Sequence, residues 1–307
     1  MRNFLVIAVI GVIAGLASLT GTAVPARASG PVLPPPSSMA ATGDSFTRTF
    51  ATGSASCDGF GSCSWSTGTV VNSHYERLRA LNPVLTGNAT NAAQLGAPMS
   101  TFVTQVGTIA PSQPDYVTVL LGGGDVCFLS TTAEQFASQF RAGMDALFAA
   151  SPGSHVLVAS IPNLESIRSA ALAGNPSATW SICGSFFNAS PQDRAVIMGR
   201  VAQYNAVLEA ECATYANCLF DGYALFNHVW SAPEVSTVDN FHPSVAGNEM
   251  MSQVLYDAGY TWAITPANKD ACKKDGWKSV VGTQGQPFKN QGDCMQYVTT
   301  GGTPARV

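Results

Sequence analysis

Residues 39–46 read Met-Ala-Ala-Thr-Gly-Asp-Ser-Phe, a short apolar run that leads into a glycine and two polar residues. We expect this run to form a buried strand, because short apolar segments bounded by glycine are typical of sheet interiors. Gly43 permits a sharp turn after the strand, since glycine adopts conformations that other residues avoid. The turn would hold Ser45 at the edge of the sheet, where the next helix begins. Taken alone, Gly-Asp-Ser is also an ordinary turn sequence.

Two longer apolar runs predict further strands of the same sheet. Residues 116–121 are followed by three glycines, and residues 155–161 are followed by a proline. Helical periodicity marks residues 132–150, 191–215 and 243–259. Alternating strands and helices indicate an α/β fold, a three-layer α/β/α sandwich with a parallel sheet. We expect an open sheet rather than a barrel, because too few strand–helix units fit into roughly 225 residues.

A second polar motif lies close before the last predicted helix. Residues 239–243 read Asp-Asn-Phe-His-Pro. If the loop turns back on itself, Asp239 can accept a hydrogen bond from one imidazole nitrogen of His242. The other nitrogen is then free to face a hydroxyl group, which is the arrangement of a nucleophile, a base and an orienting carboxylate.

The two motifs together resemble those of the SGNH hydrolases, also called the GDSL esterase/lipase family, over about residues 39–260. The resemblance implies a flavodoxin-like fold and the hydrolysis of carboxylic esters without a cofactor. It implies that Ser45 is the nucleophile, His242 the general base and Asp239 the residue that orients the base. No Gly-x-Ser-x-Gly is present, so the nucleophile elbow of the α/β-hydrolases is not expected.

The resemblance also implies an oxyanion hole, to which the backbone N–H of Ser45 would contribute. In the family, a glycine after the second strand donates a backbone N–H, and Gly87 is the predicted match. A second family position is the Asn of Gly-x-Asn-Asp, but residues 122–125 read Gly-Gly-Gly-Asp, so Gly124 stands where Asn is expected. Backbone N–H groups, another side chain such as that of Asn88, or a loss of activity would each account for this departure. Asp125 is expected to accept hydrogen bonds from loop N–H groups.

The substrate is less well determined than the reaction. Residues 180–187, Trp-Ser-Ile-Cys-Gly-Ser-Phe-Phe, would either line an acyl pocket or simply pack as a loop. Small esters, lipid esters and acetylated polysaccharides all stay open as substrates. A different hypothesis is a non-catalytic or weakly active secreted protein that binds carbohydrate or another surface on this scaffold. Labelling of Ser45 by a fluorophosphonate would distinguish the two hypotheses.

Composition divides the chain into four predicted segments. Residues 1–28 resemble a cleaved secretion signal, with an apolar run and an Ala-Arg-Ala cleavage site, and residues 29–38 form a Pro/Ser linker. Residues 39–264 are predicted as the hydrolase domain, and residues 265–307 as a small C-terminal module. The segment 29–264 has seven arginines against sixteen acidic residues, a net charge of −9, whereas the module carries +3. We therefore expect a secreted protein with no membrane span after cleavage.

The C-terminal module contains two cysteines, a tryptophan and several lysines. Residues 272–278 read Cys-Lys-Lys-Asp-Gly-Trp-Lys, and residues 288–294 read Phe-Lys-Asn-Gln-Gly-Asp-Cys. This pattern resembles a short module found at the end of various secreted bacterial proteins. A cross-linked end cap and a surface that binds anionic polymers are both consistent with it.

The cysteines, the net charge and the histidine spacing bear on disulfide pairing, nucleic-acid binding and metal binding. Eight cysteines allow 105 disulfide connectivities. Pairing in sequence order is the simplest prediction: Cys57–Cys63, Cys127–Cys183, Cys212–Cys218 and Cys272–Cys294. A net charge of −4 argues against a nucleic-acid partner. No Cys-x-x-Cys occurs and the histidines lack metal-ligand spacing, so no metal site is expected.

Overall fold

The computed structural model describes residues 32–57, 61–128, 131–282 and 286–302. The predicted secretion signal lies outside these residues. The centre of the fold is one parallel sheet of five strands in the order β2-β1-β3-β4-β5. The strands are β1 (Met39–Gly43), β2 (Ala89–Asn91), β3 (Tyr116–Leu120), β4 (His155–Val158) and β5 (Cys218–Phe220). The prediction of an open parallel sheet is confirmed.

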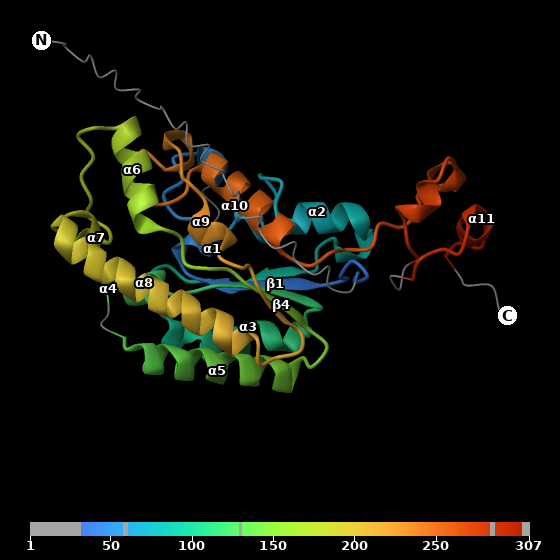
Figure 1. Ribbon diagram of the computed structural model, residues 1–307, viewed down its shortest axis with the longest axis horizontal. Coiled ribbons are helices and arrows are strands. Elements are labelled where there is room, and N and C mark those ends of the chain that lie inside the picture. Colours follow the sequence, from blue (N-terminus) through green and yellow to red (C-terminus); the bar gives the residue numbers. More distant parts are fainter. Residues whose placement is uncertain (1–31, 58–60, 129–130, 283–285, 303–307) are drawn as a thin grey trace, which may run out of the picture.

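Helices cover both faces of this sheet (Figure 1). One face carries α3 (Phe102–Ile109), α5 (Ala133–Ala150) and α8 (Pro191–Cys212). The other face carries α1 (Ser45–Arg48), α2 (His74–Leu81), α9 (Ala224–Asn227) and α10 (Val245–Ala258). Helix α4 (Gly123–Phe128) comes directly after β3, and helix α6 (Leu164–Gly174) comes directly after β4. The short helix α7 (Gly184–Phe187) follows α6 in the chain. The predicted three-layer α/β/α sandwich is therefore present.

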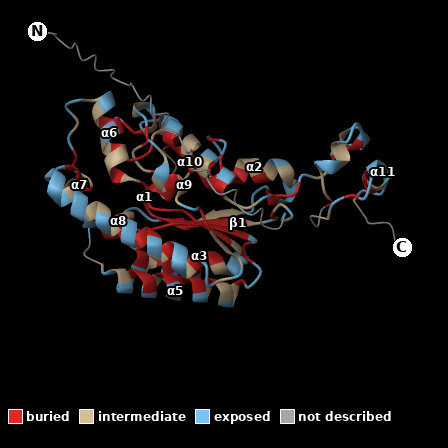
Figure 2. Ribbon diagram, in the orientation of Figure 1, coloured by how far each residue is buried: buried red, intermediate tan, exposed pale blue. Residues whose placement is uncertain are grey.

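The central strands and helices form where the apolar pattern predicts them. Strands β1 and β3 are buried along their whole length, and the core lies between the sheet and the inner helix faces (Figure 2). Helix α5 begins with a capping box between Thr132 and Gln135, and its apolar stripe from Phe136 to Leu147 is buried. Within the described residues, no helix combines the length and the apolarity needed to cross a bilayer.

Residues 33–38, which belong to the predicted Pro/Ser linker of residues 29–38, pack against the domain. Leu33 donates its N–H to the Thr261 carbonyl and accepts from the Ala263 N–H, at 2.9 and 2.7 Å. The Ser37 and Ser38 N–H groups both donate to the Asp115 carboxylate. Prolines do not prevent this, because their carbonyls still accept hydrogen bonds. The segment therefore lies along the amino ends of the strands.

Four disulfides join the cysteines in sequence order, namely Cys57–Cys63, Cys127–Cys183, Cys212–Cys218 and Cys272–Cys294. The last of these staples the C-terminal residues, where α11 (Gln291–Thr299) packs Tyr297 against Phe288. This part lies to one side of the sandwich (Figure 1). Its core is separate and small, so the disulfide supplies much of what holds it together.

Candidate active site

The turn after β1 requires glycine at position 43. A Cβ atom there would lie 2.4 Å from the Thr47 Oγ1 and 2.8 Å from the Leu120 carbonyl oxygen. The buried side chain of Gln105 fixes the same backbone, because its Oε1 accepts from the Gly43 N–H at 2.7 Å and its Nε2 donates to the Gly43 carbonyl at 3.0 Å. The chain is thus held rigidly just before it delivers Ser45 to the edge of the sheet. No local motif indicates this role for Gln105, which lies 62 positions after Gly43.

Asp44 caps the short helix that begins with Ser45. Its Oδ1 accepts from the Phe46 N–H at 3.0 Å, and its Oδ2 accepts from the Gly123 N–H at 3.2 Å. Burial raises the pKa of Asp44 to about 6, against the lowering effect of these two hydrogen bonds and of the nearby His242. The carboxyl group therefore links the turn after β1 to the start of α4.

The loop before α10 turns back on itself and presents His242. The Ser236 N–H donates to the His242 carbonyl at 2.8 Å. Asp239 Oδ1 accepts from the N–H groups of Phe241 and His242, both at 3.0 Å. Asn240 adopts a left-handed φ of 58°, which Asn tolerates better than most residues. These contacts place the Asp239 carboxylate directly beside the imidazole.

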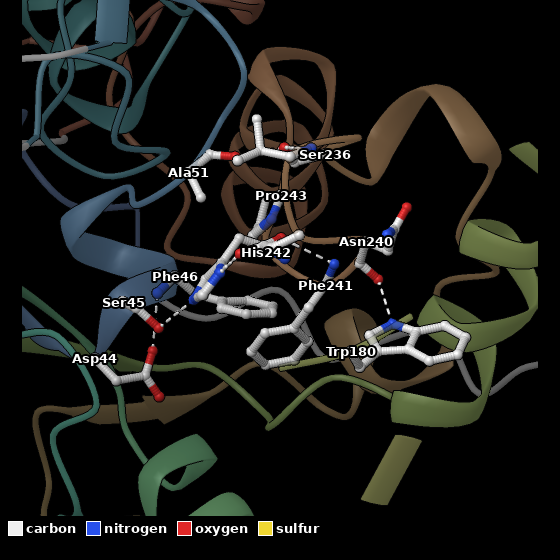
Figure 3. Close-up of polar contacts among 12 residues, drawn as sticks. Asp44, Ser45, Phe46, Ala51, Trp180, Ser236, Asn240, Phe241, His242 and Pro243 are labelled. Atoms are coloured by element: carbon white, nitrogen blue, oxygen red, sulfur yellow. Dashed lines mark hydrogen bonds and ion pairs between the residues drawn. The ribbon is translucent and has the colours of Figure 1, made fainter. Parts of the chain in front are cut away.

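Ser45 and His242 meet at the carboxyl edge of the sheet (Figure 3), and Asp239 lies beside His242. The Ser45 Oγ lies 2.8 Å from the His242 Nε2, and the His242 Nδ1 lies 2.5 Å from the Asp239 Oδ2. The serine and the histidine are 197 positions apart in the chain. Burial alone would raise the pKa of Asp239, but the hydrogen bonds from His242 and the charge of its ring hold that pKa below its ordinary value. Asp239 is thus ionised and able to stabilise a protonated imidazole.

Aromatic side chains enclose His242 and brace its loop. The rings of Phe46, Phe50 and Phe241 have centroids 5.7, 5.2 and 4.6 Å from the imidazole centroid. The Trp180 indole N–H donates to the Asn240 carbonyl at 2.8 Å (Figure 3). The arrangement limits the access of water to the imidazole and limits the motion of the Asp239–His242 loop.

The prediction that Gly87 donates to an oxyanion is wrong on geometry. Gly87 precedes β2, and β2 runs parallel to β1, so Gly87 lies toward the amino edge of the sheet, opposite Ser45. Its N–H donates to the Tyr75 hydroxyl at 3.0 Å. Asn88 lies at the same edge, where its amide donates to the Ser37 and Val84 carbonyls. The glycine that follows β2 and borders the site is Gly96.

Gly124 borders the site, but no side chain fits at this position. A Cβ atom on Gly124 would lie 2.5 Å from the Gly96 carbonyl oxygen and 2.6 Å from that of Ala97. Both neighbours are backbone atoms, so the loop after β2 would have to move. In this chain the loop after β2 occupies the space that a side chain at position 124 would need. The next residue, Asp125, accepts from the Met99 N–H at 2.7 Å and from the Thr131 hydroxyl at 2.8 Å, as the sequence predicts for a structural acceptor.

We expect Gly124→Ala to lower the free energy of unfolding by about 1–3 kcal/mol, the usual cost of overpacking. Urea denaturation followed by circular dichroism measures this change. The matched control is Gly199→Ala, in the middle of α8, where a Cβ would meet nothing within 4 Å. The control is expected to raise stability by about 0.5–1 kcal/mol. Equal effects of the two substitutions would contradict the steric explanation.

A cavity of about 330 Å³ opens beside Ser45 and His242. Ser181 and Ile182 line it, from the stretch predicted either to line an acyl pocket or to pack as a loop. Cys127 also lines it, and its disulfide to Cys183 ties this loop to α4. Within the described residues, no group of three His, Cys, Asp or Glu side chains is placed to hold a metal ion.

Among solved structures, an extracellular lipase from Streptomyces rimosus is 21% identical, with a TM-score of 0.49 over 72% of this chain and 99% of that one. A lipase from a goat rumen metagenome is 16% identical, with a TM-score of 0.48 over 73% and 97% of the two chains. A family 3 carbohydrate esterase from Clostridium thermocellum is 16% identical, with a TM-score of 0.44 over 72% and 93%. No curated protein matches the chain.

A family model gives the decisive comparison. The model of the GDSL-like lipase/acylhydrolase family matches residues 41–250. The matched region begins within β1, includes both polar motifs and ends within α10. The chain therefore belongs to the GDSL-like lipase/acylhydrolase family of hydrolases.

Proposed function

We propose that this protein is a secreted serine esterase that cleaves carboxylic esters with Ser45, His242 and Asp239. Family membership supports a hydrolase of the esterase or lipase type. The observation that carries the assignment of residues is the continuous line of contacts from Ser45 Oγ to His242 Nε2 and from His242 Nδ1 to Asp239 Oδ2, at 2.8 and 2.5 Å. A hydroxyl, an imidazole and a carboxylate in this order form the relay of serine hydrolases.

In the proposed reaction, His242 Nε2 takes the proton of Ser45 as Oγ bonds to the ester carbonyl carbon. The tetrahedral intermediate collapses when the bond between that carbon and the alcohol oxygen breaks, and Nε2 gives its proton to the leaving alcohol. Water then attacks the acyl-enzyme while Nε2 takes a water proton. The bond between the acyl carbon and Oγ then breaks, which releases the acid, and Nε2 returns its proton to Oγ. The Asp239 carboxylate stabilises the imidazolium that forms in both halves.

The negative oxygen of the tetrahedral intermediate requires hydrogen-bond donors. We assign this role to the backbone N–H groups of Ser45 and Gly96, both of which border the cavity. Gly124 supplies no side-chain donor. Because the loss of one donor typically lowers the rate by about 10²–10³, the proposed hole depends on accurate placement of the two backbone groups. The clamp by Gln105 on Gly43 contributes to that placement.

Secretion is part of the same proposal. Residues 1–28 have the composition of a cleaved secretion signal. Four disulfides are consistent with an oxidising compartment outside the cytosol. We further propose that residues 39–264 are the hydrolase domain and residues 265–307 a separate module.

The test is the release of p-nitrophenol from p-nitrophenyl butyrate by the purified protein. Turnover above the rate of a heat-denatured sample supports the proposal. A fluorophosphonate that fails to label the folded protein, together with no turnover, would instead favour a non-catalytic binding protein on this scaffold.

A further inference from the structure

The cavity beside Ser45 offers few polar groups to a ligand. Among the described residues that line it, only Asp44, Ser45, Ser181 and His242 have polar side chains. The Asp44 oxygens already accept from two backbone N–H groups, and Ser45 and His242 are bonded to each other. Among the described lining residues, Ser181 is the polar side chain that takes part in none of these contacts. A hydroxyl buried there without a partner would lose its hydrogen bonds to water, so the lining disfavours sugar hydroxyls.

The same lining is well suited to an alkyl chain. Leu120 is the last residue of β3, and Ile161 lies three residues after β4. Both line the cavity and are almost fully buried, so its inner end is apolar. Leu164 and Val126 also line the cavity, and their apolar side chains are buried. Each methylene group of a ligand that enters such a site gains about 0.8 kcal/mol. An acetyl group would leave most of the cavity, which has a volume of about 330 Å³, unfilled.

The apolar lining continues from the inner end to the outer surface. Leu95 and Phe128 border the cavity and are 45% and 58% exposed, which is high for large apolar side chains. Phe128 lies close to Gly96, since a Cβ atom on that glycine would be 3.7 Å from the phenyl ring. A chain that fills the interior can therefore continue over an apolar rim. The rim adjoins the residue proposed to donate to the oxyanion.

One wall of the cavity is a loop fixed by a covalent link. Ile182 lines the cavity, and its neighbour Cys183 is bonded to Cys127 on α4, which lines the cavity too. The neighbouring Trp180 ring stacks on Phe187 with a centroid separation of 5.3 Å. The loop that carries Ile182 is therefore tied to α4, and Ile182 lines the cavity from a fixed position.

We propose that the acyl group of the substrate is an unbranched apolar chain longer than butyryl, bound in this cavity, and that Ile182 is a specificity-determining residue for its length. This inference rests on the proposed esterase function and names its substrate class. An acetylated polysaccharide is excluded as the preferred substrate on this account. The acyl chain, rather than the alcohol, occupies the cavity.

The first test is a series of p-nitrophenyl acetate, butyrate and hexanoate at concentrations below micelle formation. Because 0.8 kcal/mol per methylene corresponds to about a fourfold change, kcat/KM for hexanoate should exceed that for acetate on the order of 10²-fold. A flat series, or acetate as the best substrate, would overturn the inference. A preference seen only in the alcohol part, in hexyl acetate over methyl acetate, would also overturn it.

The second test changes the cavity wall. Ile182→Trp should narrow the cavity and lower the hexanoate-to-acetate ratio of kcat/KM at least tenfold. The matched control is Val196→Trp on α8, a residue that is 68% exposed and does not line the cavity, and it should leave the ratio within twofold. An unchanged ratio in a folded Ile182→Trp protein would contradict the role of Ile182.

Labelling with a fluorophosphonate separates the two possible failures. If Ser45 is labelled and acetate is hydrolysed but no chain preference appears, the substrate inference fails and the esterase proposal stands. If Ser45 is not labelled and none of the esters is hydrolysed, the esterase proposal itself fails.

Discussion

Ser45→Ala should abolish the hydrolysis of p-nitrophenyl esters, with a loss in kcat on the order of 10⁶. The reason is chemical, because alanine has no oxygen to form the acyl-enzyme and His242 then has no proton to accept. The serine side chain is only partly buried and bonds to one partner, His242, in the described structure. The fold should therefore survive, with the thermal unfolding midpoint close to that of the wild type.

The control for Ser45→Ala is Ser177→Ala, which removes an exposed hydroxyl on the loop after α6. Its kcat should equal that of the wild type. If Ser45→Ala retained turnover within tenfold of the wild type, another group would have to be the nucleophile.

Asp239→Asn should lower kcat by about 10⁴, the effect seen when the orienting carboxylate of a serine hydrolase is made neutral. The Asn oxygen can still accept the N–H groups of Phe241 and His242, so the loop should keep its shape. What is lost is the negative charge beside the imidazole and the preference for the proton on Nδ1. Because hydrogen bonds from His242 hold the pKa of Asp239 low, the wild-type carboxylate is charged throughout the neutral range, and the loss should persist there.

Kinetics between pH 6 and 8 measure this effect, with Asp257→Asn as the control for the removal of an exposed carboxylate. A loss of less than tenfold for Asp239→Asn would mean that the carboxylate does not support the base. An equal loss in the control would point to the overall charge instead.

Much of the architecture could be predicted because the central strands are buried on both faces. The run at residues 116–121 contains only one polar residue, a threonine, and no helical periodicity, so its assignment as a strand was secure. The strand β2 gave no such signal. It is three residues long, reads Ala-Thr-Asn and is only half buried, so the sequence does not indicate where the second strand lies. For this reason the sequence predicts Gly87 rather than Gly96 as the glycine that follows the strand.

The site shows a second limit of sequence reasoning. The motifs predict Ser45 and His242 as site residues, since each depends on a local turn that the sequence encodes, and the two side chains lie in contact. The steric reason for Gly124 was not predictable, because it lies in a contact with the carbonyl groups of Gly96 and Ala97, nearly 30 residues away. Likewise the clamp by Gln105 and the brace by Trp180 arise from tertiary packing. Residues that support a site through backbone contacts leave little trace in a single sequence.

The central claim is that His242 activates the Ser45 hydroxyl as a nucleophile. Reaction with a fluorophosphonate, followed by peptide mass spectrometry, tests it most directly. The account predicts one phosphonyl group per protein molecule, located on the peptide that contains Ser45, and a labelling rate at least 10³-fold lower in His242→Ala. An unlabelled Ser45, or a rate unaffected by the loss of the imidazole, would contradict it.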